Sequence, residues 1–260
     1  MSLAPVQLIR RTSSGLPPLA YRLLEGKVRP GIIYIHGWMS SMNSAKVEAL
    51  ERHATATGQS FLCFDQTFCG QSTNQGETPD YGFDPWRRDV LQAIDELSDG
   101  PQILVGSSLG GWLALLSAIE RPSRVVGVVS VCIAVGFFER YALQMAAADE
   151  KFRNELDAGK TVFHKGYPLN RRSVNESCAA DLRRWPAPLG VNCAYRAVHG
   201  LLDDVAPPEV STEMVNKVAT SDAWLTLVKD ADHRFNRPAD HALICSMVQQ
   251  LTEQYSASKL

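Results

Sequence analysis

The sequence of 260 residues lacks the cysteine patterns of disulfide frameworks and of common metal sites. Its six cysteines contain no Cys-x-x-Cys pair and no metal-ligand spacing. Three of them, Cys63, Cys132 and Cys193, lie inside apolar runs typical of strands, where a thiol is usually buried. We therefore expect free thiols in a reducing compartment, and neither a metal nor a cofactor. The remaining three are Cys69, Cys178 and Cys245.

A strong charge of either sign is also missing. The net charge is −2, acidic and basic residues are interspersed, and lysine and arginine form no stripe. This excludes the basic surface expected of a protein that binds nucleic acid or an anionic membrane, and it favours small neutral or modestly charged substrates. One local cluster is expected to be a solvated face rather than a ligand site; it comprises Arg171, Arg172, Arg183 and Arg184.

The chain has no long apolar run. The longest, residues 125–138, is too short for a membrane span and is interrupted by Ser130. The N-terminus lacks the apolar core of a secretory signal, and residues 10–14 only faintly resemble a transit peptide. We expect a cytoplasmic protein without a transmembrane segment, with a mitochondrial location as the alternative. At this length we expect one domain, residues 1–260, with an inserted segment.

What the sequence does contain is a strand, a sharp turn and a helix in direct succession. Residues 99–115 begin with a turn signal, continue as an apolar run, and form a Gly-x-Ser-x-Gly corner at Gly106, Ser108 and Gly110. The corner alone arises by chance in roughly one chain in ten of this length, so a plain glycine-rich turn is the alternative. The strand before it and the helix after it favour a nucleophile at Ser108.

Such a corner suits a nucleophile for a physical reason. Glycine at 106 and 110 removes side chains that would collide at so sharp a turn, so Ser108 is held out at the carboxyl edge of a sheet. The amide of Leu109 opens the following helix and can donate a hydrogen bond where negative charge develops. Ser107 is expected to pack or to support its neighbours.

An early strand, residues 31–38, ends in His36-Gly37-Trp38. A backbone amide at this place supplies the second oxyanion donor in hydrolases with this layout, and we assign that role to Trp38. His36 is expected to be a structural histidine bonded to loop backbone, because the turn needs its geometry and not its proton.

An acid and a histidine each follow a late strand. Residues 193–198 lead into His-Gly-x-x-Asp, which ends at Asp203, and residues 223–228 lead into the loop that carries His233. Because the carboxyl ends of parallel strands converge on one edge of a sheet, Ser108, Asp203 and His233 can meet. Asp204 is the less favoured choice of acid.

Among six histidines only His233 follows the last strand. The flanking Asp230 and Asp232 are expected to form the turn. The other histidines lie on predicted helices (His53, His241), in the inserted segment (His164) or in turns before glycine (His36, His199).

Strands and helices alternate along most of the chain, which predicts a mostly parallel, doubly wound α/β sheet. Residues 7–10 and 19–24 are expected to form an antiparallel edge pair. Further strands are predicted at 60–65 and 124–131, helices at 45–57, 84–98 and 238–255, and a loop at 66–79.

The alternation fails between about residues 136 and 190, which we interpret as an inserted lid. Helical pieces over 138–156 are mixed there with loop signals. Five large apolar side chains in its first helical piece are equally consistent with the lining of an acyl pocket and with ordinary core; they are Phe137, Phe138, Tyr141, Leu143 and Met145.

Residues 99–122, with Trp-Arg-Arg-Asp-Val at 86–90, resemble the palmitoyl-protein thioesterase and acyl-glucuronide esterase branch of the α/β-hydrolases. The similarity is strongest over 31–131 and 199–233 and is weak across the lid. It implies the α/β-hydrolase fold and a serine hydrolase that acts on S-acylated proteins and small acyl esters. Ser108, Asp203 and His233 stand at the matching catalytic positions.

Two positions depart from the family pattern. Phe68 stands where glycine is usual, before the matching Gly70 and Ser72, so the backbone there is expected to differ or the ring to narrow the pocket. Ala206 replaces a common valine beside Pro207, which is a minor packing change.

We predict a serine hydrolase that cleaves acyl thioesters or carboxylic esters through an acyl-enzyme at Ser108, without a cofactor. Its expected partners are a small acyl ester or thioester, including an S-acylated protein. A general carboxylesterase or lipase for small esters is one alternative, and a ligand receptor on the same fold with negligible turnover is another. Acyl chain length, leaving group and oligomeric state do not follow from the sequence.

Overall fold

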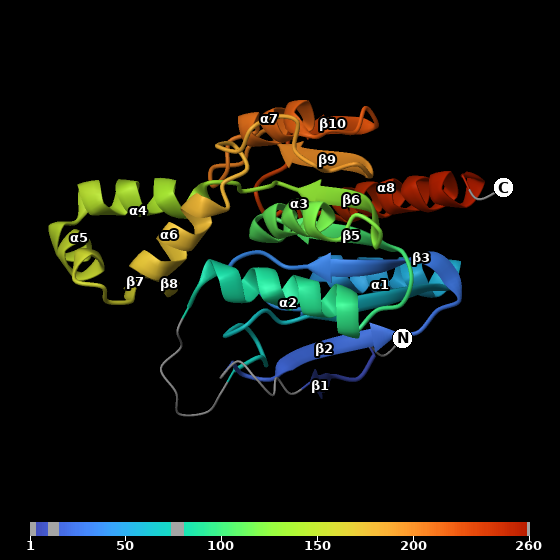
Figure 1. Ribbon diagram of the computed structural model, residues 1–260, viewed down its shortest axis with the longest axis horizontal. Coiled ribbons are helices and arrows are strands. Elements are labelled where there is room, and N and C mark those ends of the chain that lie inside the picture. The colour runs from blue at the N-terminus through green and yellow to red at the C-terminus, as the bar shows by residue number, and fades with distance from the viewer. Residues whose placement is uncertain (1–3, 10–15, 74–80, 259–260) are drawn as a thin grey trace.

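An eight-stranded sheet forms the centre of the computed structural model, which describes residues 4–9, 16–73 and 81–258 (Figure 1). The sheet order is β1-β2-β4-β3-β5-β6-β9-β10. The strands are β1 (Gln7–Ile9), β2 (Leu19–Leu24), β3 (Val28–Ile35), β4 (Gln59–Phe64), β5 (Gln102–Ser107), β6 (Val125–Val131), β9 (Ala194–Gly200) and β10 (Ala223–Val228).

Only one edge of this sheet is antiparallel. Strand β2 pairs antiparallel with β1 and β4, and every pairing from β4 through β3, β5, β6 and β9 to β10 is parallel. The predicted edge pair and the mostly parallel sheet are therefore confirmed. The predictions for residues 10–15 and for the loop at 74–79 lie outside the described residues.

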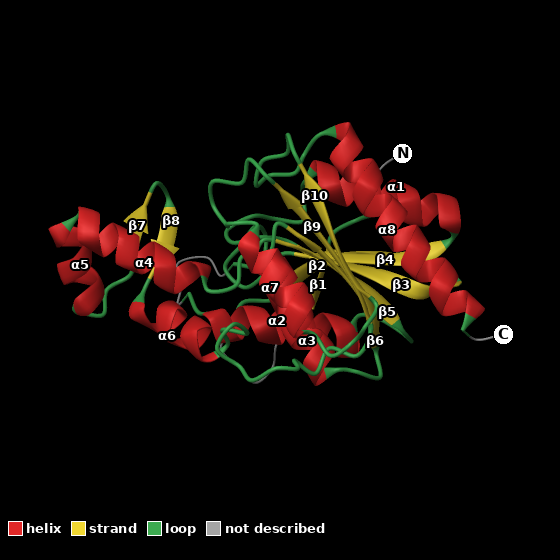
Figure 2. Cartoon of the chain, turned by 90° about the horizontal axis from the view of Figure 1, so that it is seen from above, coloured by secondary structure: helices red, strands yellow, loops and turns green. Residues whose placement is uncertain are grey.

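Helices cover both faces of the sheet (Figure 2). On one face lie α1 (Ala45–Thr57) and α8 (Pro238–Ala257); on the other lie α2 (Phe83–Glu96), α3 (Leu109–Glu120) and α7 (Glu209–Lys217). The range predicted for α1 is confirmed, since the Ser44 side chain accepts from the Val47 amide at its start and Gly58 ends it with φ 73°. Helix α7 was not predicted, because Val210, Ser211 and Met214 are its only buried residues and give a weak apolar pattern.

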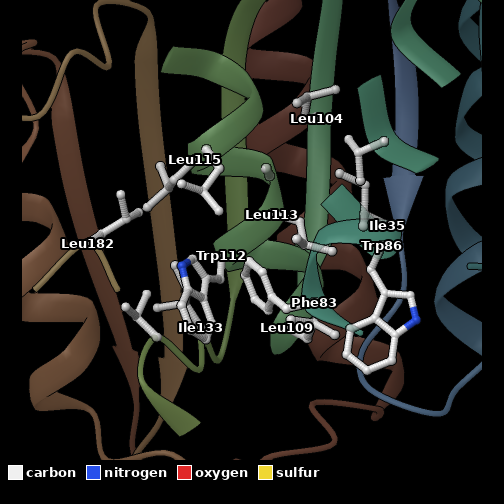
Figure 3. Close-up of a cluster of buried hydrophobic side chains, with 14 of the residues drawn as sticks. Ile35, Phe83, Trp86, Leu104, Leu109, Trp112, Leu113, Leu115, Ile133 and Leu182 are labelled. Carbon is white, nitrogen blue, oxygen red and sulfur yellow. The ribbon is translucent and has the colours of Figure 1, made fainter. Parts of the chain in front are cut away.

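The central strands are buried on both faces, as parallel strands between two helical layers must be. In β5, Ile103 and Val105 belong to the core beneath α1 and α8, and Leu104 belongs to the core on the opposite face. In that second core Phe83 of α2 packs against Trp112 of α3, with ring centroids 4.5 Å apart (Figure 3). This packing fixes α3, and with it the turn that precedes α3.

Between β6 and β9 the chain leaves the sheet and forms α4 (Phe137–Ala148), α5 (Glu150–Asp157), the hairpin β7 (Val162–His164) and β8 (Tyr167–Leu169), and α6 (Arg171–Ala179). These elements lie beyond one end of the sheet (Figure 1). The hairpin turns at Lys165 and Gly166, both with positive φ, which is the geometry of a tight two-residue turn. We call residues 136–190 the insertion.

Candidate active site

The turn between β5 and α3 holds Ser108 in a strained backbone conformation, with φ 57° and ψ −115°. A Cβ on Gly106 would lie 2.2 Å from the carbonyl oxygen of Gly110, and one on Gly110 would lie 2.1 Å from that of Ile35. At both places another part of the backbone lies too close to leave room for a side chain, so only glycine fits. The predicted reason for these two glycines is confirmed.

Ser108, His233 and Asp203 form a continuous hydrogen-bonded chain. The Ser108 Oγ lies 3.0 Å from Nε2 of His233, and Nδ1 of His233 lies 2.7 Å from Oδ2 of Asp203. Since a carboxylate only accepts, Nδ1 carries the proton and Nε2 is free to accept from the serine hydroxyl. The structure thus brings together three side chains that are separated by up to 125 residues.

Asp203 is held as an anion. Its side chain is fully buried, and its Oδ1 accepts from the amides of Val205 and Ala206, both at 2.8 Å. Burial alone would raise the pKa of Asp203, but hydrogen bonds from His199, His233 and the Ala206 amide outweigh it and lower that pKa. Asp204, the alternative acid, is exposed.

The loop that carries His233 is anchored on both sides. The Asp232 carboxylate accepts from the amides of Arg234 and Phe235 at 3.0 and 3.1 Å, so its predicted role as a turn former is confirmed. From α1, the buried ammonium of Lys46 donates to the carbonyl of Arg234. Burial lowers the pKa of Lys46. The imidazole therefore stands on a loop that packing and hydrogen bonds both restrain.

The backbone amides of Leu109 and Trp38, which the sequence predicts as oxyanion donors, belong to the turns around Ser108. Leu109 is the first residue of α3, and Trp38 follows Gly37, where an added Cβ would lie 3.3 Å from Cβ of Ser108. Within the described part of the chain, neither amide donates to another group. His36 is fully buried, accepts at Nε2 from the Gln66 amide, and lies 2.7 Å from the Gly37 carbonyl through Nδ1. Its predicted structural role is confirmed.

Phe68 has φ 62°, in the left-handed region that glycine favours. The loop therefore adopts a conformation suited to glycine, although a phenylalanine occupies the position. The ring is nearly buried and packs against Tyr81 with centroids 5.7 Å apart.

Comparison with known proteins gives the family. A sequence profile of the alpha/beta hydrolase fold matches residues 30–175. A human palmitoyl-protein thioesterase, the mitochondrial ABHD10, is 37% identical over 245 residues, which cover 93% of this chain and 78% of that protein. This chain belongs to the α/β-hydrolase family, in the branch of that thioesterase.

Solved structures agree with this assignment. The α/β-hydrolase domain-containing protein 10 from mouse is 31% identical and superposes with a TM-score of 0.83, covering 97% of this chain and all of the other. The ferulic acid complex of Est1E from Butyrivibrio proteoclasticus, at 18% identity and a TM-score of 0.74 over 96% of this chain and 99% of that one, shares the fold. The predicted α/β-hydrolase fold is confirmed.

The insertion of this α/β-hydrolase contacts the ring of Trp38 with four aromatic side chains. The centroid distances are 5.6 Å to Phe137, 5.1 Å to Phe138, 5.8 Å to Tyr141 and 5.1 Å to Tyr167. The insertion therefore rests on the residue whose amide is a candidate oxyanion donor. Tyr167 had no sequence signal, because Gly-Tyr-Pro reads as a loop.

The five insertion residues predicted to form a pocket or a core have different positions in this hydrolase. Phe138 is buried and also stacks on Trp86, so it is core. Leu143 is 66% exposed, so it is neither core nor enclosed pocket. Phe137, Tyr141 and Met145 are partly buried.

The arginine cluster of the insertion is neutralised by neighbouring acids, as expected for a surface face. Each guanidinium forms an ion pair: Arg171 with Asp157, Arg172 with Glu176, Arg183 with Asp181, and Arg184 with Glu139.

Two side chains next to Asp203 were not predicted to belong to the site. Cys132 directly follows β6 with φ 48° and is fully buried. Its Sγ lies close to a carboxylate oxygen of Asp203 and a ring nitrogen of His233, and these three atoms are all within 4.8 Å of one another. Burial raises the pKa of the Cys132 thiol to about 12, and both Asp203 oxygens already accept N–H groups. His199 lies on the other side, with Nε2 3.0 Å from Oδ2 of Asp203.

Among the described residues, the structure contains no helix with the length and apolar character that crossing a membrane requires.

Proposed function

We propose that this hydrolase cleaves acyl thioesters or carboxylic esters through an acyl-enzyme at Ser108. The observation that carries the proposal is the unbroken hydrogen-bonded chain from Ser108 through His233 to Asp203. It places a base 3.0 Å from the serine hydroxyl and an ionised acid behind that base. This is the arrangement that activates a serine towards an acyl carbon.

In the acylation step, Ser108 Oγ attacks the acyl carbon and its proton passes to Nε2 of His233. The oxyanion accepts from the amides of Trp38 and Leu109, each contributing on the order of 3 kcal/mol. The tetrahedral intermediate then collapses, and the bond between the acyl carbon and the leaving sulfur or oxygen breaks. The leaving thiolate or alkoxide takes the proton from His233. Water then repeats the sequence on the acyl-enzyme and releases the acid.

We propose S-acylated proteins and related long-chain acyl thioesters as the substrate class. Two observations support this. The relatives that cover most of the chain are named palmitoyl-protein thioesterases, and the insertion lays aromatic side chains on Trp38, whose neighbour Gly37 lies against Ser108. Aromatic and apolar surface next to an acyl carbon is what a long hydrocarbon chain requires.

The test is a series of acyl thioesters and p-nitrophenyl esters of increasing chain length, assayed with wild type and Ser108→Ala. We expect many turnovers for wild type, the highest kcat/KM on long-chain thioesters, and fluorophosphonate labelling that disappears in Ser108→Ala. A preference for short oxyesters would identify a general carboxylesterase or lipase instead. Labelling of Ser108 without turnover on any substrate would identify a ligand receptor.

The compartment is tested separately. The sequence favours the cytoplasm, with the mitochondrion as the alternative, and the word mitochondrial in the names of the relatives supports the alternative. Fractionation of cells that express the full chain with a C-terminal tag distinguishes the two.

A further inference from the structure

We propose that His199 is a positioning residue that holds the Asp203 carboxylate in the orientation His233 requires. The inference rests on the proposed function and adds a fourth side chain to the Ser108–His233–Asp203 chain. His199 is the penultimate residue of β9, its side chain is fully buried, and its Nε2 is 3.0 Å from the same Asp203 oxygen that accepts from His233.

The surroundings of His199 determine its tautomer. Its Nε2 lies near two groups that only accept, the Asp203 carboxylate at 3.0 Å and the Ala206 carbonyl at 2.9 Å. Nε2 must therefore carry a hydrogen. The Nδ1 atom lies 2.7 Å from Oγ of Ser211 on α7, and in the neutral ring it accepts from that hydroxyl. A hydroxyl can donate or accept, so Ser211, which is fully buried, complements the tautomer that the two acceptors require and holds the ring in place, with its Nε2 hydrogen shared between the Ala206 carbonyl and Asp203.

Asp203 needs such a donor because its charged side chain is buried while the residues on either side of it are exposed. Leu202 is 62% exposed, and Asp204 is also exposed. The amides of Val205 and Ala206 hold Oδ1, but they belong to the same loop and move with it. His199 belongs to a strand paired on both sides, so it ties Oδ2 to the rigid sheet. Hydrogen bonds of this kind around a reacting group set its orientation and commonly govern rate.

The experiment compares His199→Gln with His199→Leu. The glutamine amide can place an N–H near the position of Nε2, whereas leucine cannot donate. We expect His199→Leu to lower kcat by about 10- to 100-fold with KM nearly unchanged, and His199→Gln to retain most of the activity. The matched control is His53→Leu, because Nε2 of His53 has no hydrogen-bond partner among the described residues and His53 stands in the second half of α1.

A second variant keeps the test decisive if His199→Leu does not fold. Ser211→Ala keeps the imidazole and removes the hydroxyl that bonds its Nδ1, so the ring loses one of the contacts that orient it. We expect a kcat decrease of about 3- to 10-fold in the wild-type background and no further decrease in His199→Gln, where no imidazole remains to orient. Equal losses in His199→Gln and His199→Leu, or additive losses with Ser211→Ala, would overturn the proposal.

A spectroscopic measurement separates this proposal from the proposed function. The proton on Nδ1 of His233, hydrogen-bonded to Asp203, is observed by NMR without any substrate. We expect its resonance in wild type and His199→Gln, and its broadening or loss in His199→Leu. If wild type turns over no acyl substrate but shows this pattern, the function is wrong and the positioning role stands. If the resonance is the same in all three proteins, the positioning role is wrong.

Discussion

The carboxyl edge of the sheet and the insertion differ in how closely the chain packs on itself. At the edge, a Cβ on Gly106, Gly110 or Gly200 would lie 2.1–2.2 Å from a carbonyl oxygen of another segment. In the insertion, a Cβ on Gly159 or Gly166 would meet nothing within 4 Å. At these positions the edge is closed by backbone, whereas the two positions of the insertion are open; a Cβ on Gly136, where the insertion begins, would meet the side chain of Arg183 and not backbone.

This difference indicates which region sets the geometry of the proposed chemistry and which region sets the substrate preference. The groups of the proposed chemistry stand on backbone that other backbone holds in place, which gives the fixed geometry that proton transfer requires. The insertion is held by side-chain contacts and surface ion pairs, which are weaker and more easily varied. We therefore expect changes at the edge to abolish turnover or folding, and changes in the insertion to alter substrate preference.

The largest effect is expected at the nucleophile. Ser108→Ala should lower kcat by about 10⁴-fold or more on any acyl substrate, because no other group forms the acyl-enzyme. The melting temperature should not fall, which circular dichroism measures in parallel. The matched control is Ser107→Ala, whose side chain hydrogen-bonds Tyr34 and not His233. Equal loss in both variants would show that the turn, and not the hydroxyl of Ser108, supports turnover.

The next effect is on folding. Gly110→Ala should destabilise the protein by at least about 3 kcal/mol, because the new Cβ meets the carbonyl of Ile35. Gly166→Ala has open space but φ 84°, so we expect a cost of only about 1 kcal/mol from backbone strain. Urea unfolding of the two alanine variants measures the difference. Similar midpoints would contradict the contrast between the two regions.

A smaller effect concerns acid stability. The pKa of Asp203 is lowered in the folded protein, so its ionised form stabilises the fold at pH values above the unfolded pKa of about 4. This contribution is lost as the pH falls below that value. The melting temperature of wild type should therefore exceed that of Asp203→Asn at pH 5, and the gap should shrink towards pH 2.5. A gap that stays constant or widens over this window would contradict the lowered pKa.

The smallest effect is expected in the hairpin of β7 and β8, where we predict a change in substrate preference and almost none in stability. Tyr167→Ala removes a ring that contacts Trp38, and we expect the ratio of kcat/KM for long and short acyl chains to change by about 5- to 10-fold. Phe163→Ala is the matched control, since this ring is 63% exposed on the same hairpin. Both variants should melt within a few degrees of wild type. An unchanged ratio in Tyr167→Ala would remove the hairpin from substrate selection.

Prediction from the sequence succeeded where a local pattern and its tertiary role coincide. The Gly-x-Ser-x-Gly motif specifies a strained turn between a strand and a helix, and Ser44 and Gly58 mark the two ends of α1. The meeting of Ser108, Asp203 and His233 followed from a topological rule, since parallel strands end at one edge. No long-range contact had to be known for any of these.

It failed where a residue acts through a partner that is distant in the sequence. His199 was interpreted as a turn residue, and its contact with Ser211 could not be expected because α7 itself was not predicted. Tyr167 and Trp38 are 129 positions apart, and no periodicity links a loop tyrosine to a turn tryptophan.

The sequence by itself therefore determined the fold class, the strained serine and the order in which acid and histidine follow it, because turn chemistry and apolar periodicity are local properties of the chain. Only the tertiary structure decided which groups hold Asp203 and which rings rest on Trp38. Those contacts depend on where separate loops and helices pack against one another, and packing is a property of the whole chain.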